Sequence, residues 1–412
     1  MDSASRSAEE LQSRCCIAGG GPAGMMLGFL LARAGIEVVV LEKHADFLRD
    51  FRGDTIHPST LEVMHELGIL EELLKLPYHP LQQFRAQIGG EEFVMADFSR
   101  LPTKCRFIAL MPQWDFLNFL AEQARRYSTF HLRLQAEVTG LLEDAGRIAG
   151  VRVKTPGGPL EIRAALVVGA DGRNSIVRDS SGLKVDDIGA PMDGLWMRIS
   201  RKPNDPQLVL RFDRGKILVT IDRGDYWQCA VVIPKGSLEE TQRKGIEDLR
   251  AGIVEVAPFL SDRVSELRDW SDLKLLTVKV DRLHKWYRSG LLCIGDAAHA
   301  MSPIGGVGVN LAIQDAVAAA NILAGPLGQG AVTEEHLARV QRRRAFPTRL
   351  TQGFQVMIQK RLIARVLSTS ERVELPWPLR RMLRSKFFSR VRGRIIGVGF
   401  RPEHVHTPDI CK

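Results

Sequence analysis

Cysteine is scarce in this sequence and never occurs in the spacings that bind metals or form redox pairs. The cysteines number six in 412 residues, and no two of them form a CxxC motif. This pattern argues against a structural metal cluster, a disulfide framework and a dithiol relay. Three of the cysteines, Cys15, Cys16 and Cys293, fall in expected core strands, where a thiol behaves as a small buried hydrophobe.

Long apolar runs and export signals are also missing. No uninterrupted apolar stretch is long enough to span a bilayer. Residues 1–14 are polar and lack the basic-then-apolar order of a signal peptide. We therefore expect a flexible leader over 1–14 and a cytoplasmic protein. A chain of 412 residues is long enough for two intertwined domains.

Acidic residues are rare toward the C-terminal end. From Arg339 to Lys412 there are 18 Lys and Arg against four Asp and Glu, whereas the whole chain carries a formal charge of +9. The preceding part is therefore mildly acidic. No nucleic-acid-binding module accompanies the basic end, so we expect no nucleic-acid partner.

Glycine is abundant at one informative place near the start. Cys15–Ala18 predicts a buried strand, and Gly19, Gly21 and Gly24 follow it with GxGxxG spacing before an expected helix over residues 25–34. The three glycines allow a tight turn, close approach of backbone to a pyrophosphate, and packing of helix on strand. The helix N-terminus favours an anion. This stretch predicts a dinucleotide cradle.

A carboxylate follows at the distance expected for ribose recognition. Residues 37–41 predict a second buried strand that ends at Glu42, 18 residues after Gly24. An acid at this place accepts hydrogen bonds from ribose hydroxyls, which suits FAD or NAD and disfavours a 2′-phosphate.

Two further acids stand at the ends of buried strands. Residues 165–169 lead to Asp171, and residues 290–295 lead to Asp296. Open α/β sheets bind ligands at the carboxyl ends of their strands. A second glycine-rich loop over 301–310 then feeds an Ala-rich helix over 311–323.

The middle of the chain follows an antiparallel pattern. We expect a hairpin over 84–94, strands over 207–212, 216–221, 226–233 and 273–280, and one helix over 238–256. Short antiparallel strands are expected over 131–134, 137–142, 148–154 and 160–163.

The three motifs together, Gly19–Gly24 with Glu42, Gly169–Gly172, and Gly295–Asp296 with residues 303–310, resemble the flavoprotein monooxygenases of the para-hydroxybenzoate hydroxylase type (class A). The resemblance covers about residues 15–323 and implies bound FAD with NAD(P)H as transient donor. It implies further cofactor contacts beyond Gly19, Gly21, Gly24, Glu42, Asp171 and Asp296, namely Pro22, Ala23, Lys43, Arg52, Gln113, Val138, Pro303, Gly308, Val309 and Asn310.

The resemblance also implies a fold and a division of the chain. The fold is α/β, with a Rossmann-like FAD-binding domain (GR2-type) interleaved with an antiparallel-sheet substrate domain and followed by C-terminal helices. The expected segments are a leader over 1–14, an FAD-binding domain over 15–75, 105–187 and 283–330, a substrate domain over 76–104 and 188–282, and a basic helical region over 331–412.

The implied activity is hydroxylation of an aromatic or other electron-rich hydrophobic small molecule with O2, through a flavin C4a-hydroperoxide. Because the flavin carries this chemistry, no catalytic side chain is assigned, and no metal is expected. His57, His299 and Asp315 are interpreted as capping or supporting residues. Two alternatives stay open: a flavin-dependent reductase of isoprenoid-type double bonds, and a non-enzymatic FAD-fold binding protein.

The basic C-terminal end has two interpretations. Residues 331–367 and 379–388 are expected to be helical, and the second stretch mixes Arg and Lys with Leu and Phe. This is typical of a helix packed on the domain with a solvated basic face, and also of peripheral contact with the inner face of an anionic membrane. The sequence does not assign the substrate, its contacts or the oligomeric state.

Overall fold

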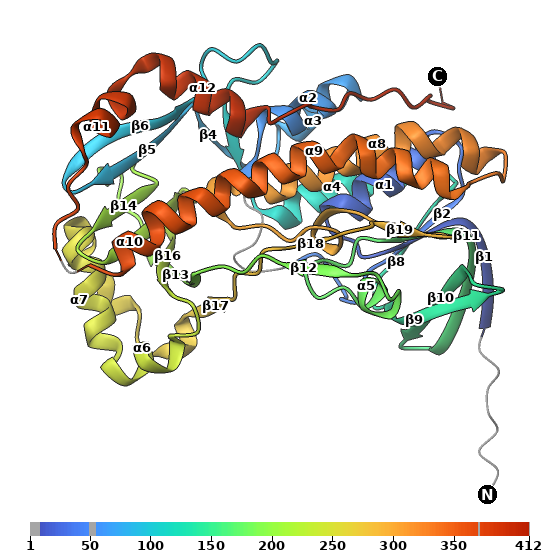
Figure 1. Ribbon diagram of the computed structural model, residues 1–412, viewed down its shortest axis with the longest axis horizontal. Helices are drawn as coiled ribbons and strands as arrows, with labels where there is room; N and C mark the ends of the chain where they lie inside the picture. Colours follow the sequence, from blue (N-terminus) through green and yellow to red (C-terminus); the bar gives the residue numbers. More distant parts are fainter. Residues whose placement is uncertain (1–8, 49–54, 370, 412) are drawn as a thin grey trace, which may run out of the picture.

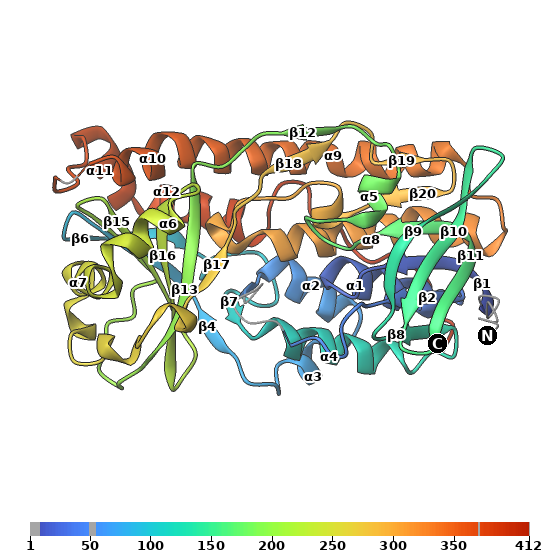
Figure 2. The same cartoon turned by 90° about the horizontal axis from the view of Figure 1, so that it is seen from below.

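Two sheets lie end to end in an elongated molecule, and one long helix runs along both (Figures 1 and 2). The computed structural model describes residues 9–48, 55–369 and 371–411. The mixed α/β class expected from the sequence is confirmed, with C-terminal helices added to the two sheets.

The first sheet has a parallel centre with the order β19-β20-β11-β1-β2-β8. Strands β10 and β9 add to it as an antiparallel extension of β11. Buried runs form its central strands, because a strand covered on both faces needs apolar side chains throughout. The bounds are β1 (Glu9–Ala18), β2 (Val38–Leu41), β8 (Phe130–Arg133), β9 (Glu137–Asp144), β10 (Arg147–Thr155), β11 (Gly158–Gly169), β19 (Tyr287–Arg288) and β20 (Leu291–Cys293).

Three expectations for this sheet are wrong. Strand β1 begins at Glu9 and pairs along β11, so residues 9–14 belong to the sheet and not to a leader. Strand β8 pairs parallel to β2 and is not antiparallel. The expected strands over 160–163 and 165–169 are one continuous strand, β11. In each case the partner lies far away in sequence, so local alternation could not reveal the pairing.

The second sheet is mainly antiparallel, with the order β17-β13-β16-β15-β14-β5-β6. Its strands come from residues 83–97 and 192–276, on either side of strands that belong to the first sheet. The bounds are β5 (Gln83–Ile88), β6 (Glu91–Asp97), β13 (Met192–Ser200), β14 (Leu210–Asp213), β15 (Lys216–Asp222), β16 (Tyr226–Pro234) and β17 (Lys274–Leu276).

Two expectations for this part need correction. The helix over 238–256 is two helices, α6 (Leu238–Lys244) and α7 (Ile246–Val256), because Gly245 adopts φ 92°, which interrupts the helix. The expected strand over 273–280 is paired only from Lys274 to Leu276, since the chain then turns away toward β18 (Asp281–Leu283).

Small elements connect the two sheets. Strand β7 (Ile108–Leu110) pairs with both β3 (Thr55–Ile56) and β4 (His79–Leu81), and β12 (Val185–Asp187) pairs with β18. The remaining short elements are α2 (Pro58–Glu66), α3 (Leu70–Leu73), α5 (Ile176–Ser180), η1 (Pro258–Leu260), η2 (Val264–Glu266), η3 (Trp270–Asp272), η4 (Gly295–Ala297) and η5 (Ile304–Gly306).

Helix α1 (Pro22–Arg33) packs on β1 and β2 and contacts both α4 (Gln113–Ala124) and α8 (Gly308–Gly328). The stretch Ile304–Gly328 is the one described helical segment with the length and mean hydropathy (1.4) of a membrane span. Because 78% of its most apolar 18-residue window is buried inside the protein, it serves as a core helix.

The C-terminal region closes one end of the molecule. Helix α9 (Glu334–Ile358) continues through a π-helical turn, Gln359–Ile363, into α10 (Ala364–Leu367), and α11 (Trp377–Arg384) and α12 (Lys386–Gly397) then cross β5 and β6 (Figure 1). The last residues return to the C-terminal end of α1, where Arg33 Nη1 donates to the Thr407 carbonyl at 2.6 Å.

Candidate functional site

The glycine-rich turn after β1 forms a cradle at the N-terminus of α1. Gly19 has φ 106°, and a Cβ there would lie 2.4 Å from the Ala170 carbonyl oxygen. A Cβ on Gly24 would lie 1.9 Å from the Gly19 oxygen, so this glycine allows the helix to pack on the turn. At Gly21 a Cβ would meet nothing within 4 Å. Gly21 is also the N-cap of α1 and provides no side-chain cap, which leaves the helix N-terminus suited to an anion.

Glu42 stands at the end of β2 beside this cradle. Its Oε2 accepts from the Gly20 N–H and its Oε1 from the His44 N–H, both at 3.1 Å. These bonds fix the carboxylate at the rim of the cavity, where the ribose of a bound dinucleotide would lie. Lys43, Val138 and Gln113 line the same part of the cavity.

Asp171 follows β11 and holds the next loop in place. Its carboxylate accepts from the Ser175 hydroxyl and, at 3.1 Å, from the Val177 N–H, so it supports the start of α5. Burial raises the pKa of Asp171 above its ordinary value, although these hydrogen bonds act in the opposite direction. The residue also lines the cavity, next to Arg173.

Arg173 joins this loop to the one that follows β20. Its Nη2 lies 3.7 Å from Asp296 Oδ2, and both side chains remain partly exposed to the cavity. The Arg173 carbonyl accepts from Arg178 Nη2 at 2.8 Å, which fixes the loop further. Sequence reasoning missed Arg173 as a site residue, although it stands within the stretch that follows Asp171.

A buried ionic network supports the Asp296 loop from behind. Asp315 Oδ2 accepts from the Gly295 N–H at 3.1 Å and lies 2.6 Å from His299 Nε2, and its Oδ1 accepts from Arg344 Nε at 2.9 Å. Burial raises the pKa of Asp315, but His299 and Arg344 outweigh it, so the net pKa is lowered. Arg344 also pairs with Glu403 at 3.2 Å, which ties the C-terminal segment to the loop.

The loop before α8 is held against Thr55 and α2. Gly306 has φ 64° and sits against Thr55, whose hydroxyl donates to the Gly306 carbonyl at 2.9 Å. Asn310 Oδ1 accepts from the His57 N–H at 2.9 Å and from the Thr60 hydroxyl at 2.7 Å. Asn310 therefore acts as a buried brace for the loop and does not line the main cavity.

Three glutamines on one face of α9 and the π-helical turn clamp the same loop. Gln352 Nε2 donates to the Ala300 carbonyl at 3.0 Å, and Gln355 Nε2 donates to the Ser302 and Ile304 carbonyls at 2.9 and 2.8 Å. Gln359 Nε2 donates to the Ser302 hydroxyl at 2.8 Å. Sequence reasoning missed this clamp. Its only signal in the sequence is that the three glutamines are three and four residues apart, which places them on one face of a helix.

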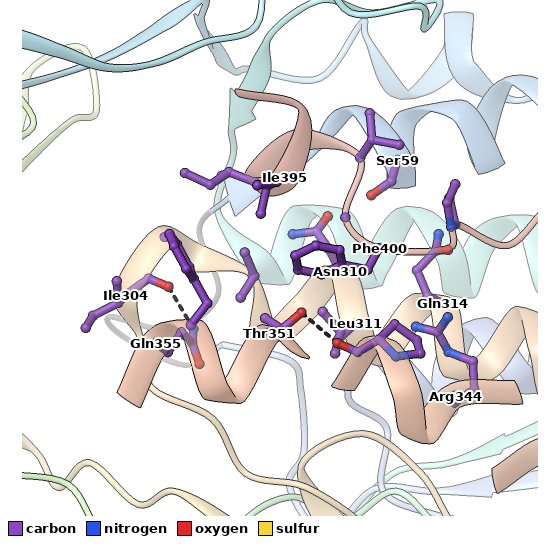
Figure 3. Close-up of a pocket in the computed structure, with 18 of the residues that line it drawn as sticks. Ser59, Ile304, Asn310, Leu311, Gln314, Arg344, Thr351, Gln355, Ile395 and Phe400 are labelled. Carbon is purple, nitrogen blue, oxygen red and sulfur yellow. Dashed lines mark hydrogen bonds between the residues drawn. The ribbon is translucent and has the colours of Figure 1, made fainter. Parts of the chain in front are cut away.

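A small side cavity of about 80 Å³ lies where α9, the loop and α12 meet (Figure 3). Gln355 reaches the Ile304 carbonyl at its edge, and Phe400 and Ile395 close it from the C-terminal side (Figure 3). His57 lies behind it, with Nδ1 2.8 Å from the Ile396 carbonyl. Burial lowers the pKa of His57 to about 4, so this histidine is neutral at physiological pH.

The main cavity measures about 1430 Å³ and is continuous from the glycine-rich turn to the second sheet. At the sheet end its walls are mostly apolar, with Asp193, Arg361 and Arg392 as charged residues among them, and they come from the second sheet, the π-helical turn, α11 and α12. We call this end the chamber. It is lined by residues that include Phe84, Met95, Met192, Trp196, Leu210, Phe212, Val219, Val232, Ile358, Leu362, Leu379, Leu383, Phe388, Val391 and Ile395.

Most residues expected to contact the cofactor meet at the other end of this cavity. Those that line it are Gly19, Gly21, Pro22, Ala23, Glu42, Lys43, Gln113, Val138, Asp171, Asp296, Pro303, Gly308 and Val309. Gly24 and Asn310 stand behind the wall and act through packing and hydrogen bonds. Arg52 lies outside the described residues. Whether each lining residue touches the cofactor stays a prediction.

The fold and this end of the cavity define a class of protein, a dinucleotide-binding α/β protein with an apolar chamber attached. The residues present fit FAD, because the cradle is open at Gly21 and a fixed carboxylate stands at the ribose position. The family model described as "FAD binding domain" matches residues 12–353.

Similar proteins agree with this class. The chain is 32% identical over 351 residues to 6-methylpretetramide 4-monooxygenase of Streptomyces rimosus, covering 85% of this chain and 84% of that protein. It is 30% identical over 319 residues to dialkyldecalin synthase of Streptomyces rugosporus, covering 73% of this chain but 63% of that protein. The solved structure of PqsL, a probable FAD-dependent monooxygenase from Pseudomonas aeruginosa, has a TM-score of 0.73 at 23% identity and covers 87% of this chain and 98% of PqsL, which shows the shared fold.

The chain therefore belongs to the FAD-binding-domain family of aromatic-hydroxylase-type monooxygenases. FAD is its cofactor, and the resemblance found in the sequence motifs is confirmed.

Proposed function

We propose that this protein uses NAD(P)H and O2 to hydroxylate a large, apolar, electron-rich aromatic compound. The observation that carries the proposal is the continuity of the FAD end of the cavity with the apolar chamber. At about 1430 Å³ the cavity exceeds the roughly 300–1000 Å³ of common ligand sites, and it would hold both FAD and a substrate of several rings. The name of the relative 6-methylpretetramide 4-monooxygenase favours such a substrate class.

When bound, FAD would accept a hydride from NAD(P)H and, once reduced, would activate O2 for transfer of one oxygen atom to the substrate. The residues of this chain position the reactants. Gly308 and Val309 bring the N-terminus of α8 to the cavity, and the positive end of its dipole favours negative charge there. The glutamine clamp and Asn310 fix this loop, which limits its reorganisation during the reaction.

The chamber walls exclude water from the substrate. Of the acids that line the cavity, Asp193 is the one on the second sheet, and its carboxylate is engaged by Lys235 at 2.8 Å and by the Gly236 and Val278 N–H groups. Because most of its lining side chains are apolar, the chamber selects a mainly apolar molecule through burial of surface. It also protects a reactive oxygen donor from hydrolysis.

The test is anaerobic mixing of the FAD-loaded protein with NADH or NADPH, with and without polycyclic phenols, followed by O2 and mass analysis of the products. The proposal expects flavin reduction and a product that has gained one oxygen atom from O2. Reduction without oxygenation of any compound, or a product with two added hydrogens and no need for O2, would contradict it and favour the reductase alternative. Absence of any turnover would favour the binding-protein alternative.

A second candidate function is ring formation without oxidation. It is favoured by the relative named dialkyldecalin synthase, which shares this family at 30% identity. The same mass analysis separates the two, because a cyclised product has the mass of its substrate and forms without NAD(P)H or O2.

A further inference from the structure

The helix pair α11 and α12 carries a strong excess of positive charge. Residues 377–397 contain seven Lys and Arg and no Asp or Glu. Three of these cations are engaged by the protein itself. Arg380 and Arg384 pair with Glu91 on β6, and Arg392 donates to the Val94 and Met95 carbonyls.

The apolar side chains of the two helices divide between two faces. The side chains of Leu379, Leu383 and Phe388 line the chamber, so the surface that they leave accessible faces the cavity. Trp377 and Phe387 do not line it, although they are 69% and 68% exposed. Their rings therefore face the surrounding solvent, where a soluble domain gains nothing from large apolar groups.

The remaining four cations are exposed on the same two helices as these rings. Arg381 lies over the Trp377 ring, 5.6 Å from its centroid. Lys386, Arg390 and Arg394 recur every four residues along the exposed side of α12, next to Phe387. No carboxylate in the described part of the chain lies within ion-pair distance of these four side chains. We call this surface the outer face; it consists of Trp377, Arg381, Lys386, Phe387, Arg390 and Arg394.

We propose that the outer face docks on an anionic lipid surface. Lys and Arg are attracted to acidic headgroups, and Trp and Phe insert at the boundary between headgroups and acyl chains. An acidic protein would match the charges but would leave the two aromatic rings without an apolar partner. The combination therefore favours a bilayer.

Docking would bring the chamber to the membrane. The same two helices present the outer face to lipid and Leu379, Leu383 and Phe388 to the chamber. An apolar substrate dissolved in the bilayer would then reach the chamber with little transfer through water. This inference concerns where the protein binds, and its test does not require the proposed hydroxylation to occur.

The experiment is co-sedimentation of the FAD-loaded protein with vesicles of phosphatidylcholine, with and without phosphatidylserine. We expect binding to the anionic vesicles at low ionic strength and weaker binding as salt is added. Each cation near an anionic surface contributes about fivefold to partitioning, so the double variant R390E/R394E should lose at least about 30-fold.

The matched control is R125E/K154E. Both of its side chains are exposed, and neither lies on α11 or α12: Arg125 follows α4, and Lys154 lies on β10, which is at the end of the molecule opposite these two helices in Figure 1. It makes the same change in net charge and should keep most of the vesicle binding. The variant W377S/F387S should weaken binding while the salt dependence remains.

Three results would overturn the proposal. These are no binding to phosphatidylserine vesicles at low salt, equal losses for R390E/R394E and R125E/K154E, or self-association of the protein that W377S/F387S abolishes without any vesicle binding. Flavin content and the thermal midpoint of each variant show that the fold is retained. Vesicle binding without hydroxylation would leave this proposal standing while the proposed function fails.

Discussion

Two glycines of the same turn should respond to alanine in different ways. A Cβ at Gly24 would lie 1.9 Å from the Gly19 oxygen, far inside the 3.4–4 Å of ordinary contact, whereas a Cβ at Gly21 would meet nothing within 4 Å. Gly24→Ala should therefore lower the stability of the apoprotein. Gly21→Ala should damage cofactor binding and leave the fold intact.

The magnitudes follow from these contacts. Gly24→Ala must push α1 away from the turn by more than ~1 Å, and overpacking of this kind costs about 1–3 kcal/mol. Gly21 has φ −74°, which alanine adopts readily. Alanine at this position lowers the entropy of the unfolded chain, which stabilises the fold, but it is a poorer N-cap than glycine, which destabilises it. Because the two effects oppose each other, the free energy of unfolding of the apoprotein should change by less than about 1 kcal/mol.

The cofactor effect at Gly21 is larger. The added methyl would occupy the space that a pyrophosphate needs at the N-terminus of α1. Loss of one hydrogen bond to a charged oxygen costs about 1.5–3 kcal/mol, which corresponds to FAD binding weaker by about 10- to 150-fold.

Two measurements check this pair. Urea unfolding of each apoprotein reports stability, and titration with FAD, followed by quenching of flavin fluorescence, reports affinity. The reasoning is refuted if Gly21→Ala lowers apoprotein stability as much as Gly24→Ala, or if it binds FAD as tightly as the unchanged protein.

Three further predictions concern the loops around the cavity. Burial lowers the pKa of His57 from 6.5 to about 4, so the unfolded chain binds a proton at a higher pH than the folded protein does. The contribution of His57 to stability is therefore full above pH ~6.5, and the free energy of unfolding should fall by up to about 3 kcal/mol as the pH drops toward 4. His57→Gln should flatten this part of the plot of urea midpoint against pH. Asp296→Ala should weaken FAD binding about tenfold or more in the same fluorescence titration, whereas unchanged affinity would count against a ribityl contact. Arg344→Met leaves the buried carboxylates of Asp315 and Glu403 short of a partner and should cost about 3–5 kcal/mol in urea unfolding; a loss below 1 kcal/mol would show that the network contributes little.

The cofactor end of the site was accessible from the sequence because each of its parts is local. A buried strand, a glycine turn and a helix N-terminus are consecutive in the chain, so spacing alone identifies Gly19, Gly21 and Gly24. Glu42, Asp171 and Asp296 each follow a buried strand directly, and parallel strands bring their carboxyl ends to one edge. The structure places all three acids at the same cavity.

The supporting residues could not be found in this way, because they act across long stretches of sequence. Arg173 meets Asp296 after 123 positions, and Gln355 reaches back 51 residues to Ile304. Helical spacing shows that Gln352 and Gln355 share a face, but not which loop that face meets. The carboxamide oxygen of Asn310 accepts from His57 and Thr60, which lie 253 and 250 positions away, and contact of Asn310 with the cofactor stays a prediction.

The sequence by itself determined the class, the cofactor and the strand-turn-helix units that cradle it, since these depend on the spacing of near neighbours. The tertiary structure alone decided that the β1 strand starts at Glu9, that β8 runs parallel, and that the basic C-terminal helices complete the wall of an apolar chamber. The physical reason is that pairing partners and the inner or outer face of a helix are selected by contacts between distant segments, which periodicity cannot specify.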